Sequence, residues 1–132
     1  VARSFFTATV AEGKIYVLGG LSVDPGNDDE KATTDRVDVY DPAADSWQQL
    51  ADMPTAKNSH SAAFMDGKIY VTGGESNIDD FSDALEAYDP VADTWTTLAS
   101  LGQARVHHAS AVVTGKLCVF GGFSMSDRSD LV

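Results

Sequence analysis

The chain has 132 residues, of which 43% are hydrophobic and 22% charged, a balance typical of a folded domain rather than a disordered segment. Twenty acidic residues oppose nine basic ones, so the net charge of −11 argues against nucleic acid and anionic lipid as partners and favours basic proteins or cationic ligands. No apolar run approaches a membrane span, and the single cysteine, Cys118, excludes an internal disulfide and favours a reducing compartment such as the cytoplasm.

The first predicted strand, residues 3–10, is rich in small side chains and leads into a glycine-containing turn. The second strand lies in GKIYVLGG, residues 13–20, where a continuous apolar run is followed by two glycines. Such a run is typical of a strand that is covered on both faces. Residues 21–34 then form a polar segment, which we expect to be a loop.

The third predicted strand, residues 35–40, alternates apolar and polar residues with a period of two. The sequence DPAAD follows, and its Asp and Pro favour a type I turn. The fourth predicted strand, SWQQLADM, covers residues 46–53. No segment has a convincing helical period.

The same four elements then recur along the chain. GKIYVTGG occupies residues 67–74 and GKLCVFGG residues 115–122, which places the turn glycines 54 and then 48 residues apart. VYDPAADSW at 39–47 matches AYDPVADTW at 87–95, 48 residues on. The six extra residues of the first copy therefore belong to the polar segment 21–34. Four antiparallel strands in a unit of about 50 residues predict one blade of a β-propeller.

A pair of glycines, a tyrosine and a tryptophan recur in this order, and in this respect the chain resembles the kelch-repeat β-propeller family. The residues that carry the resemblance, and that we interpret as structural, are Gly19, Gly20, Tyr40, Trp47, Gly73, Gly74, Tyr88, Trp95, Gly121 and Gly122. The resemblance implies an all-β propeller segment in which the small-residue strand is innermost and the tryptophan strand outermost. We expect the tyrosines and tryptophans to be buried between adjacent blades.

The predicted blades are residues 3–53, residues 57–101 and an incomplete third blade, residues 105–132, all part of one propeller. The last segment, DRSDLV at 127–132, aligns with DRVDVY at 35–40, so the third blade stops at its third strand. Propellers close with about four to eight blades. We therefore expect the remaining blades to come from a longer chain or from a second copy.

In kelch propellers that serve as adaptors, ligands contact the loop that enters the innermost strand and the loop after the glycine pair. The resemblance therefore implies a ligand face made of Arg3, Ser4, Ser22, Lys57, Asn58, Glu75, Asn77, Arg105 and Ser124. An arc of three basic residues, one in each blade, would suit a carboxylate ligand. Alternatively, Arg3, Lys57 and Arg105 pair with the acidic residues of the loops after the glycine pairs.

No other pattern predicts a catalytic or metal site. His60 and His108 occupy equivalent repeat positions, which indicates packing or channel lining, and no zinc-binding spacing of histidines occurs. DPGNDDE departs from the calcium-loop pattern because Gly26 stands where an acid or Asn is needed. Cys118 lies in a strand that we expect to be buried, so it is a poor nucleophile. We predict no metal and no cofactor.

These observations predict a scaffold that binds a protein or peptide, such as the substrate-recognition part of a larger adaptor, and not an enzyme. The alternative is a secreted or periplasmic enzyme that acts on sugars, because the family resemblance also covers a copper radical oxidase and a sialic acid mutarotase. The oxidase type needs a tyrosine–cysteine pair, for which Cys118 is in the wrong strand. A mutarotase needs few special residues and stays open.

Overall fold

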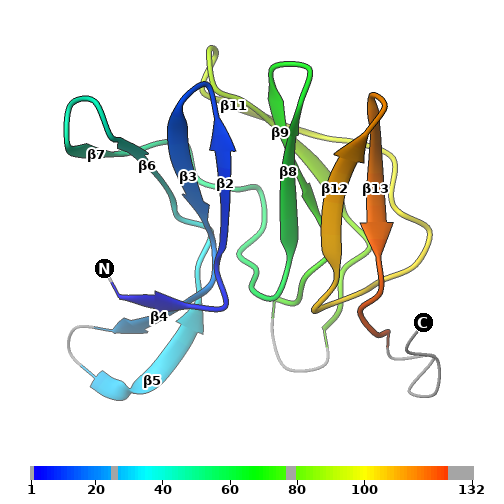
Figure 1. Cartoon of the computed structure of the whole chain (residues 1–132). Coiled ribbons are helices and arrows are strands. Elements are labelled where there is room, and N and C mark those ends of the chain that lie inside the picture. Colours follow the sequence, from blue (N-terminus) through cyan, green and yellow to red (C-terminus); the bar gives the residue numbers. More distant parts are fainter. Residues whose placement is uncertain (1, 25–26, 77–79, 125–132) are drawn as a thin grey trace.

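The structure is a computed structural model and describes residues 2–24, 27–76 and 80–124. Across these ranges the chain is all-β, with four-stranded antiparallel sheets standing side by side as successive blades of a propeller that does not close (Figure 1). None of the described residues belongs to a helix that is long and apolar enough to cross a membrane. The predicted fold class, all-β with four-stranded antiparallel blades in an incomplete ring, is confirmed.

Two blades have four strands each. Blade one has the strand order β2-β3-β6-β7, with β2 at Thr7–Ala11, β3 at Lys14–Leu18, β6 at Val37–Asp41 and β7 at Ser46–Gln49. Blade two has the order β8-β9-β10-β11, with β8 at Ser61–Met65, β9 at Lys68–Thr72, β10 at Leu85–Asp89 and β11 at Thr94–Thr97. The tryptophan strands β7 and β11 are therefore the outermost strands, as the family resemblance implies.

The third blade is described as a two-stranded hairpin of β12, Ala109–Val113, and β13, Lys116–Phe120. The third strand predicted at 127–132 lies outside the described residues. A separate small sheet has the order β1-β4-β5, with β1 at Arg3–Ser4, β4 at Leu21–Asp24 and β5 at Asn27–Thr33. The predicted loop over 21–34 is thus wrong in part, because β1 gives β4 a backbone partner and β5 extends that sheet.

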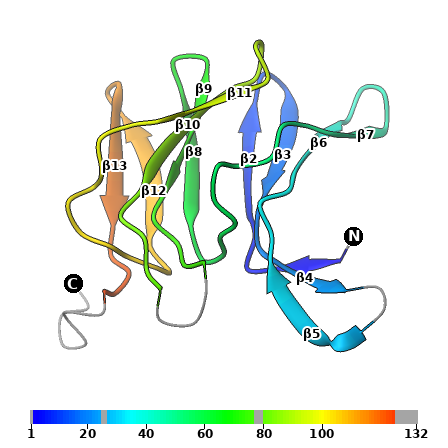
Figure 2. The ribbon, with the colours of Figure 1, turned by 180° about the vertical axis from the view of Figure 1, so that it is seen from behind.

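The first strands of the three blades, β2, β8 and β12, lie next to one another in both views (Figures 1 and 2). Their small side chains allow this close approach. Ser61 and Ser110 hydroxyls lie 2.6 Å apart across the β8–β12 boundary, and the Thr7 hydroxyl donates to the carbonyl oxygen of His60 at 2.7 Å. The innermost strands therefore bind one another directly, which positions the loops that precede them on a common face.

The main hydrophobic core fills the space between blades one and two. It contains Leu18 and Val37 from blade one and Ile69, Val71 and Tyr88 from blade two, all of them fully buried. The rings of Tyr16 and Tyr88 face each other across this boundary with centroids 6.3 Å apart. Each fully buried apolar side chain of this kind stabilises the fold by about 1.5–3 kcal/mol relative to exposure.

Hydrogen bonds from blade two hold the segment that follows β7 in blade one. The Asp93 carboxylate accepts hydrogen bonds from the Tyr88 hydroxyl at 2.6 Å and from the Ala51 backbone N–H at 2.9 Å. The indole N–H of Trp95 donates to the Ala51 carbonyl oxygen at 3.0 Å. Both backbone groups of Ala51 are thus bound, which explains why tyrosine, aspartate and tryptophan recur together in the first two repeats.

In blade one the same three side chains do not hold a preceding blade within the described residues. The Tyr40 hydroxyl donates to Asp45 at 2.7 Å, and the Tyr40 ring packs on Trp47 with centroids 5.1 Å apart. Trp47 is 63% exposed, so the prediction that every repeat tryptophan is buried between blades is wrong for this one. The physical reason is that burial of this face needs a further neighbouring blade, which is not among the described residues.

The innermost strands are also shorter than predicted. The strand predicted over residues 3–10 begins only at Thr7, and the equivalent strands β8 and β12 begin at Ser61 and Ala109. Phe5, Ser59 and His107 have φ angles of 52°, 55° and 55°. A left-handed residue interrupts a strand, so each predicted strand is divided into an entering loop and a shorter strand.

Candidate functional site

The two loops expected to contact a ligand are joined to each other in every blade. In blade one Ser4 pairs with Leu21, in blade two Asn58 with Glu75, and in blade three Val106 with Phe123, as equivalent antiparallel bridges. The bridge in blade two comprises two backbone hydrogen bonds of 3.0 Å, and the bridge in blade three two of 3.1 Å. We call the surface that these three loop pairs form the bridge face. It lies at the end of the sheets where β4 and β5 are seen in Figure 1.

The glycine pairs make this close approach of the loops feasible. A β-carbon on Gly73 would lie 2.5 Å from the carbonyl oxygen of Arg105, in the next blade, and one on Gly74 would lie 2.8 Å from that of Asn58, in the same blade. Both glycines have positive φ angles, and the N–H of Gly74 donates to the Arg105 carbonyl at 3.0 Å. Because the first glycine has no side chain, the neighbouring blade can pack closely against it. In the same way, the second glycine allows the blade's own entering loop to approach.

A chain of backbone hydrogen bonds links the entering loops from blade to blade. The N–H of Ser59 donates to the carbonyl oxygen of Phe5 at 3.1 Å, and the N–H of His107 donates to that of Ser59 at 3.0 Å. Phe5, Ser59 and His107 are the left-handed residues of the entering loops, and this backbone conformation aims the N–H groups of Ser59 and His107 at the preceding blade. The bridge face is consequently held by main chain, independently of the side chains it presents.

Lys57, one of the three predicted basic residues, does not reach the surface. Its ammonium nitrogen lies 2.6 Å from a carboxylate oxygen of Glu86 on β10, and the two side chains are 1% and 2% exposed. The hydroxyl of Thr55 donates to the other carboxylate oxygen at 3.4 Å. The expected contact of Lys57 with a ligand, or with an acid of the loops after the glycine pairs, is therefore replaced by an ion pair inside the blade.

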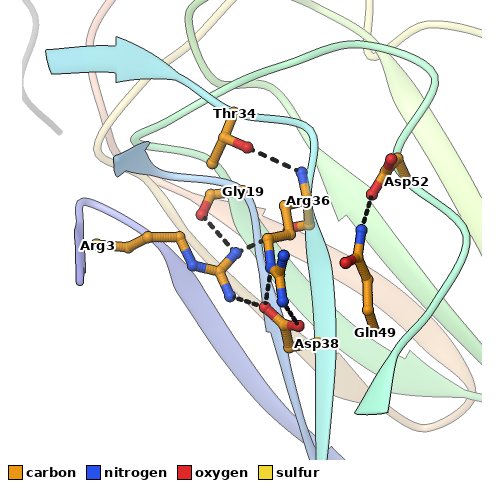
Figure 3. A network of polar contacts seen from close by, with 7 residues as sticks. All are labelled: Arg3, Gly19, Thr34, Arg36, Asp38, Gln49 and Asp52. Carbon is orange, nitrogen blue, oxygen red and sulfur yellow. Dashed lines mark hydrogen bonds and ion pairs between the residues drawn. The ribbon is translucent and has the colours of Figure 1, made fainter. Parts of the chain in front are cut away.

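Arg3 makes the equivalent contact in blade one (Figure 3). Its guanidinium donates to Asp38 on β6 and to the carbonyl oxygen of Arg36 at 2.9 Å, and Asp38 also accepts two hydrogen bonds from the Arg36 guanidinium, at 2.8 and 2.7 Å. Burial lowers the pKa of Arg3 below its ordinary value, whereas the hydrogen bonds to Asp38 raise that of Arg36. Asp38 and Glu86 occupy the same repeat position, so these two ion pairs are part of the repeat.

Arg105 donates to the carbonyl oxygen of Gly121 at 2.7 Å and to the side-chain oxygen of Gln103 at 3.2 Å. Asp130 stands where Asp38 and Glu86 stand in the other repeats but lies outside the described residues. The three basic residues thus share one position in the fold, and in the two blades where the acidic strand is described they point inward. They do not form a surface arc for a carboxylate.

The other predicted ligand contacts differ in exposure. Ser4, Ser22 and Glu75 are half-buried on the bridge face, whereas Asn58 is 5% and Ser124 6% exposed. The Asn58 side chain accepts from the Ser59 hydroxyl at 2.7 Å, and the Ser124 hydroxyl accepts from the Gln103 amide at 3.4 Å. Asn77 lies outside the described residues. Side chains of Ser4, Ser22 and Glu75 therefore remain as contacts that a ligand can reach.

His60 and His108 pack beneath this face against the glycine pair of the preceding blade. A β-carbon on Gly19 would lie 2.9 Å from the His60 ring, and one on Gly73 2.6 Å from the His108 ring. His108 is hydrogen-bonded to the Thr72 hydroxyl at 2.9 Å, whereas both ring nitrogens of His60 lack a hydrogen-bond partner. Burial lowers the pKa of His60 to about 3. Within the described ranges no group of three His, Cys, Asp or Glu side chains is arranged to hold a metal.

Two adjoining grooves cross the bridge face between blades one and two. The larger, of about 700 Å³, runs from β5 residues Lys31 and Thr33 to Asn58 and Glu75. The smaller, of about 250 Å³, lies over the loop after the second glycine pair and is lined by Thr55, Ala56, Lys57, Ser76, Asp80, Phe81, Ser82 and Asp83. They share Thr55, Ala56 and Ser76, so one extended ligand can occupy both.

A row of aromatic side chains on the bridge face was not predicted from the sequence. Phe81 packs edge-on against Phe123 at 5.7 Å, Phe123 stacks on His107 at 5.4 Å, and His107 meets Phe5 at 6.2 Å, all between ring centroids. Phe5 is 57% and Phe123 38% exposed. The alignment of the repeats could have indicated this row. Phe5 and His107 directly follow the bridged residues Ser4 and Val106, and Phe123 occupies the repeat position of Glu75.

Comparisons with known proteins agree with this arrangement of blades. The profile of the family described as the Attractin/LZTR1 beta-propeller matches residues 3–132. The chain belongs to the kelch-repeat β-propeller family. Kelch-like protein 15 of Danio rerio is 38% identical over 73 residues, which cover 55% of this chain and 12% of that protein. Kelch-like protein terF of Aspergillus terreus is 37% identical over 78 residues, which cover 59% of this chain and 17% of that protein.

The solved structure of YjhT superposes on 96% of this kelch chain and 36% of its own, with a TM-score of 0.77 and 24% sequence identity. This likeness shows the propeller fold alone. The kelch chain spans less than a fifth of the two kelch-like relatives just named. The functions of those relatives as whole proteins therefore do not transfer directly to this chain.

Proposed function

We propose that this kelch segment is part of a scaffold that binds a protein or peptide partner on its bridge face, as the substrate-recognition part of a larger adaptor. The observation that carries the proposal is the pairing of the entering loop with the loop after the glycine pair in all three blades. Loops that a rigid scaffold positions in this way commonly carry function. The relatives named kelch-like proteins lend it further support.

The chemistry of the face also favours binding over catalysis. The buried polar side chains at the grooves already have partners. Lys57 is paired with Glu86, and the Asn58 side chain accepts a hydrogen bond from the Ser59 hydroxyl. What remains accessible is an open groove system with half-buried Leu21, Glu75 and Ser76 in its lining. Such a surface offers area and hydrogen bonds to a partner, which is what an interaction scaffold needs.

Site-specific photo-crosslinking tests the proposal. A photoreactive phenylalanine analogue replaces Ser22 or Ser76 on the bridge face, and Glu12 or Asp66, in the turns at the far end of the blades, as matched controls. After irradiation in cells, the same protein adduct is expected from both bridge-face positions and from neither turn. Adducts that form equally from the turns, or none from the bridge face, would overturn the proposal.

A further inference from the structure

We propose that the bridge face recognises an arginine side chain of its partner peptide, through the aromatic row and the carboxylates beside it. This inference rests on the proposed function and specifies the chemistry of the same face. It starts from the aromatic row, Phe81–Phe123–His107–Phe5, because large apolar rings that remain partly exposed side by side mark interaction surfaces.

The rings come from all three blades and are aligned by backbone contacts. Phe123 is bridged to Val106, and Phe81 is bridged to Glu75, so two of the rings are attached to the loop pairs of the bridge face. His107 and Phe5 are the left-handed residues of the entering loops. The row is thus fixed by the same main-chain contacts as the face itself and presents ring faces and edges at rigid positions.

Carboxylates border this row, and among the described residues no ion pair neutralises their negative charge. Asp80 and Asp83 line the smaller groove together with Phe81, and Glu75 lines the larger groove. Within the described part of the chain, no lysine or arginine forms an ion pair with these three acids. Lys57 is paired with Glu86, and Arg105 donates to the carbonyl oxygen of Gly121 and the side-chain oxygen of Gln103. Exposed Lys31 also lines the larger groove, without an ion pair to Glu75.

An arginine matches this combination better than the other side chains. Its planar guanidinium stacks on aromatic rings and donates paired hydrogen bonds to a carboxylate, whereas lysine offers a compact point charge. An acidic side chain would be repelled by Glu75, Asp80 and Asp83. The chain's net charge of −11 acts in the same direction at longer range, by attracting a basic partner toward the face.

The test is a pair of short peptides, acetyl-Ser-Gly-Arg-Gly-Ser amide and its citrulline counterpart, titrated into the protein and followed by backbone amide NMR shifts. Citrulline keeps the shape of arginine and removes the charge. We expect the arginine peptide to bind about tenfold more tightly and to shift the amides of Phe81, His107 and Phe123. Equal affinity for the two peptides, or shifts spread evenly over the acidic surface, would overturn the inference.

Two matched variants separate local recognition from net charge. Asp80→Asn with Asp83→Asn removes two charges beside the aromatic row, and Glu12→Gln with Asp66→Asn removes two at the far turns. The first is expected to weaken arginine-peptide binding about fivefold or more and the second less than about twofold. Phe81→Leu keeps an apolar side chain without the ring and should lower the arginine-to-citrulline ratio. Equal losses in both charge variants contradict the inference, while adducts from Ser22 and Ser76 would still support the binding face.

Discussion

Lys57 and Glu86 form an ion pair in the interior of blade two, with 2.6 Å between nitrogen and oxygen and almost no exposure of either side chain. Lys57 belongs to the loop that enters β8, and Glu86 lies on β10, two strands away in the same sheet. The pair therefore fixes the entering loop to the blade. Because the entering loop is part of the bridge face, this interior ion pair helps to position that face.

Removal of one member of this pair should be costly. Lys57→Met leaves the Glu86 carboxylate buried without a cation, and we expect the free energy of unfolding to fall by about 3–5 kcal/mol in a denaturant titration. The double variant Lys57→Met with Glu86→Leu should regain most of that loss. A single-variant loss below about 1 kcal/mol would show that the pair does not hold the loop.

Gly67 and Gly73 in blade two differ in what surrounds them, which gives a matched comparison. Gly67 has a φ angle of 77° with open space around it, whereas Gly73 has a φ of 60° and meets the Arg105 carbonyl and the His108 ring. Alanine at either position strains the backbone, because both φ angles are positive. Only Gly73→Ala also places a β-carbon in steric conflict with blade three. It should therefore lose about 1–3 kcal/mol more than Gly67→Ala in thermal or chemical unfolding. Equal losses would contradict the packing described.

The repeat tryptophans should differ in the same way. Trp95→Ala removes a ring that packs on the core and a donor to Ala51, so a loss of about 3 kcal/mol is expected. Trp47→Ala, at a position 63% exposed, should lose less than about 1 kcal/mol. Urea unfolding of both variants makes the comparison, and a large loss at Trp47 would mean that its face is covered in solution, for instance by a second copy.

His60 predicts a specific dependence of stability on pH. Burial lowers its pKa from an ordinary 6.5 to about 3, so the folded protein resists protonation that the unfolded chain accepts. The stability that a neutral His60 provides is complete above pH 6.5 and is lost progressively as the pH falls toward 3. His60→Phe, which installs the residue that blade one carries at Phe6, should flatten this part of the curve. Parallel pH profiles of both proteins would refute the assignment.

Much of the blade architecture follows from the sequence, because glycine pairs, Tyr88 and Trp95 recur at fixed spacing and each repeat must bury the same surfaces. The backbone conformation of the entering loops was not predictable from the sequence. Nothing in the one-letter pattern shows that Phe5, Ser59 and His107 adopt left-handed backbone, since that conformation is imposed by hydrogen bonds to a neighbouring blade.

The structure places the loops at Ser22 and Glu75 on one face, and that this face binds a ligand stays a prediction. The chemistry of the entering loops was not predictable, because Lys57 forms a buried ion pair with Glu86, 29 residues away in the sequence. The aromatic row depends on contacts between blades, of Phe81 with Phe123 and of Phe5 with His107. Such contacts follow from the curvature of the propeller and leave no local pattern.

The most direct test of the bridge face as the binding surface is a complete single-substitution scan against the partner recovered by crosslinking, with folding measured in parallel. The account predicts that stable variants defective in binding cluster at Ser22, Glu75, Phe81 and Phe123, while substitutions in the turns at Glu12 and Asp66 leave binding intact. A cluster of stable, binding-defective variants at those turns or along the outer strands β7 and β11 would contradict it.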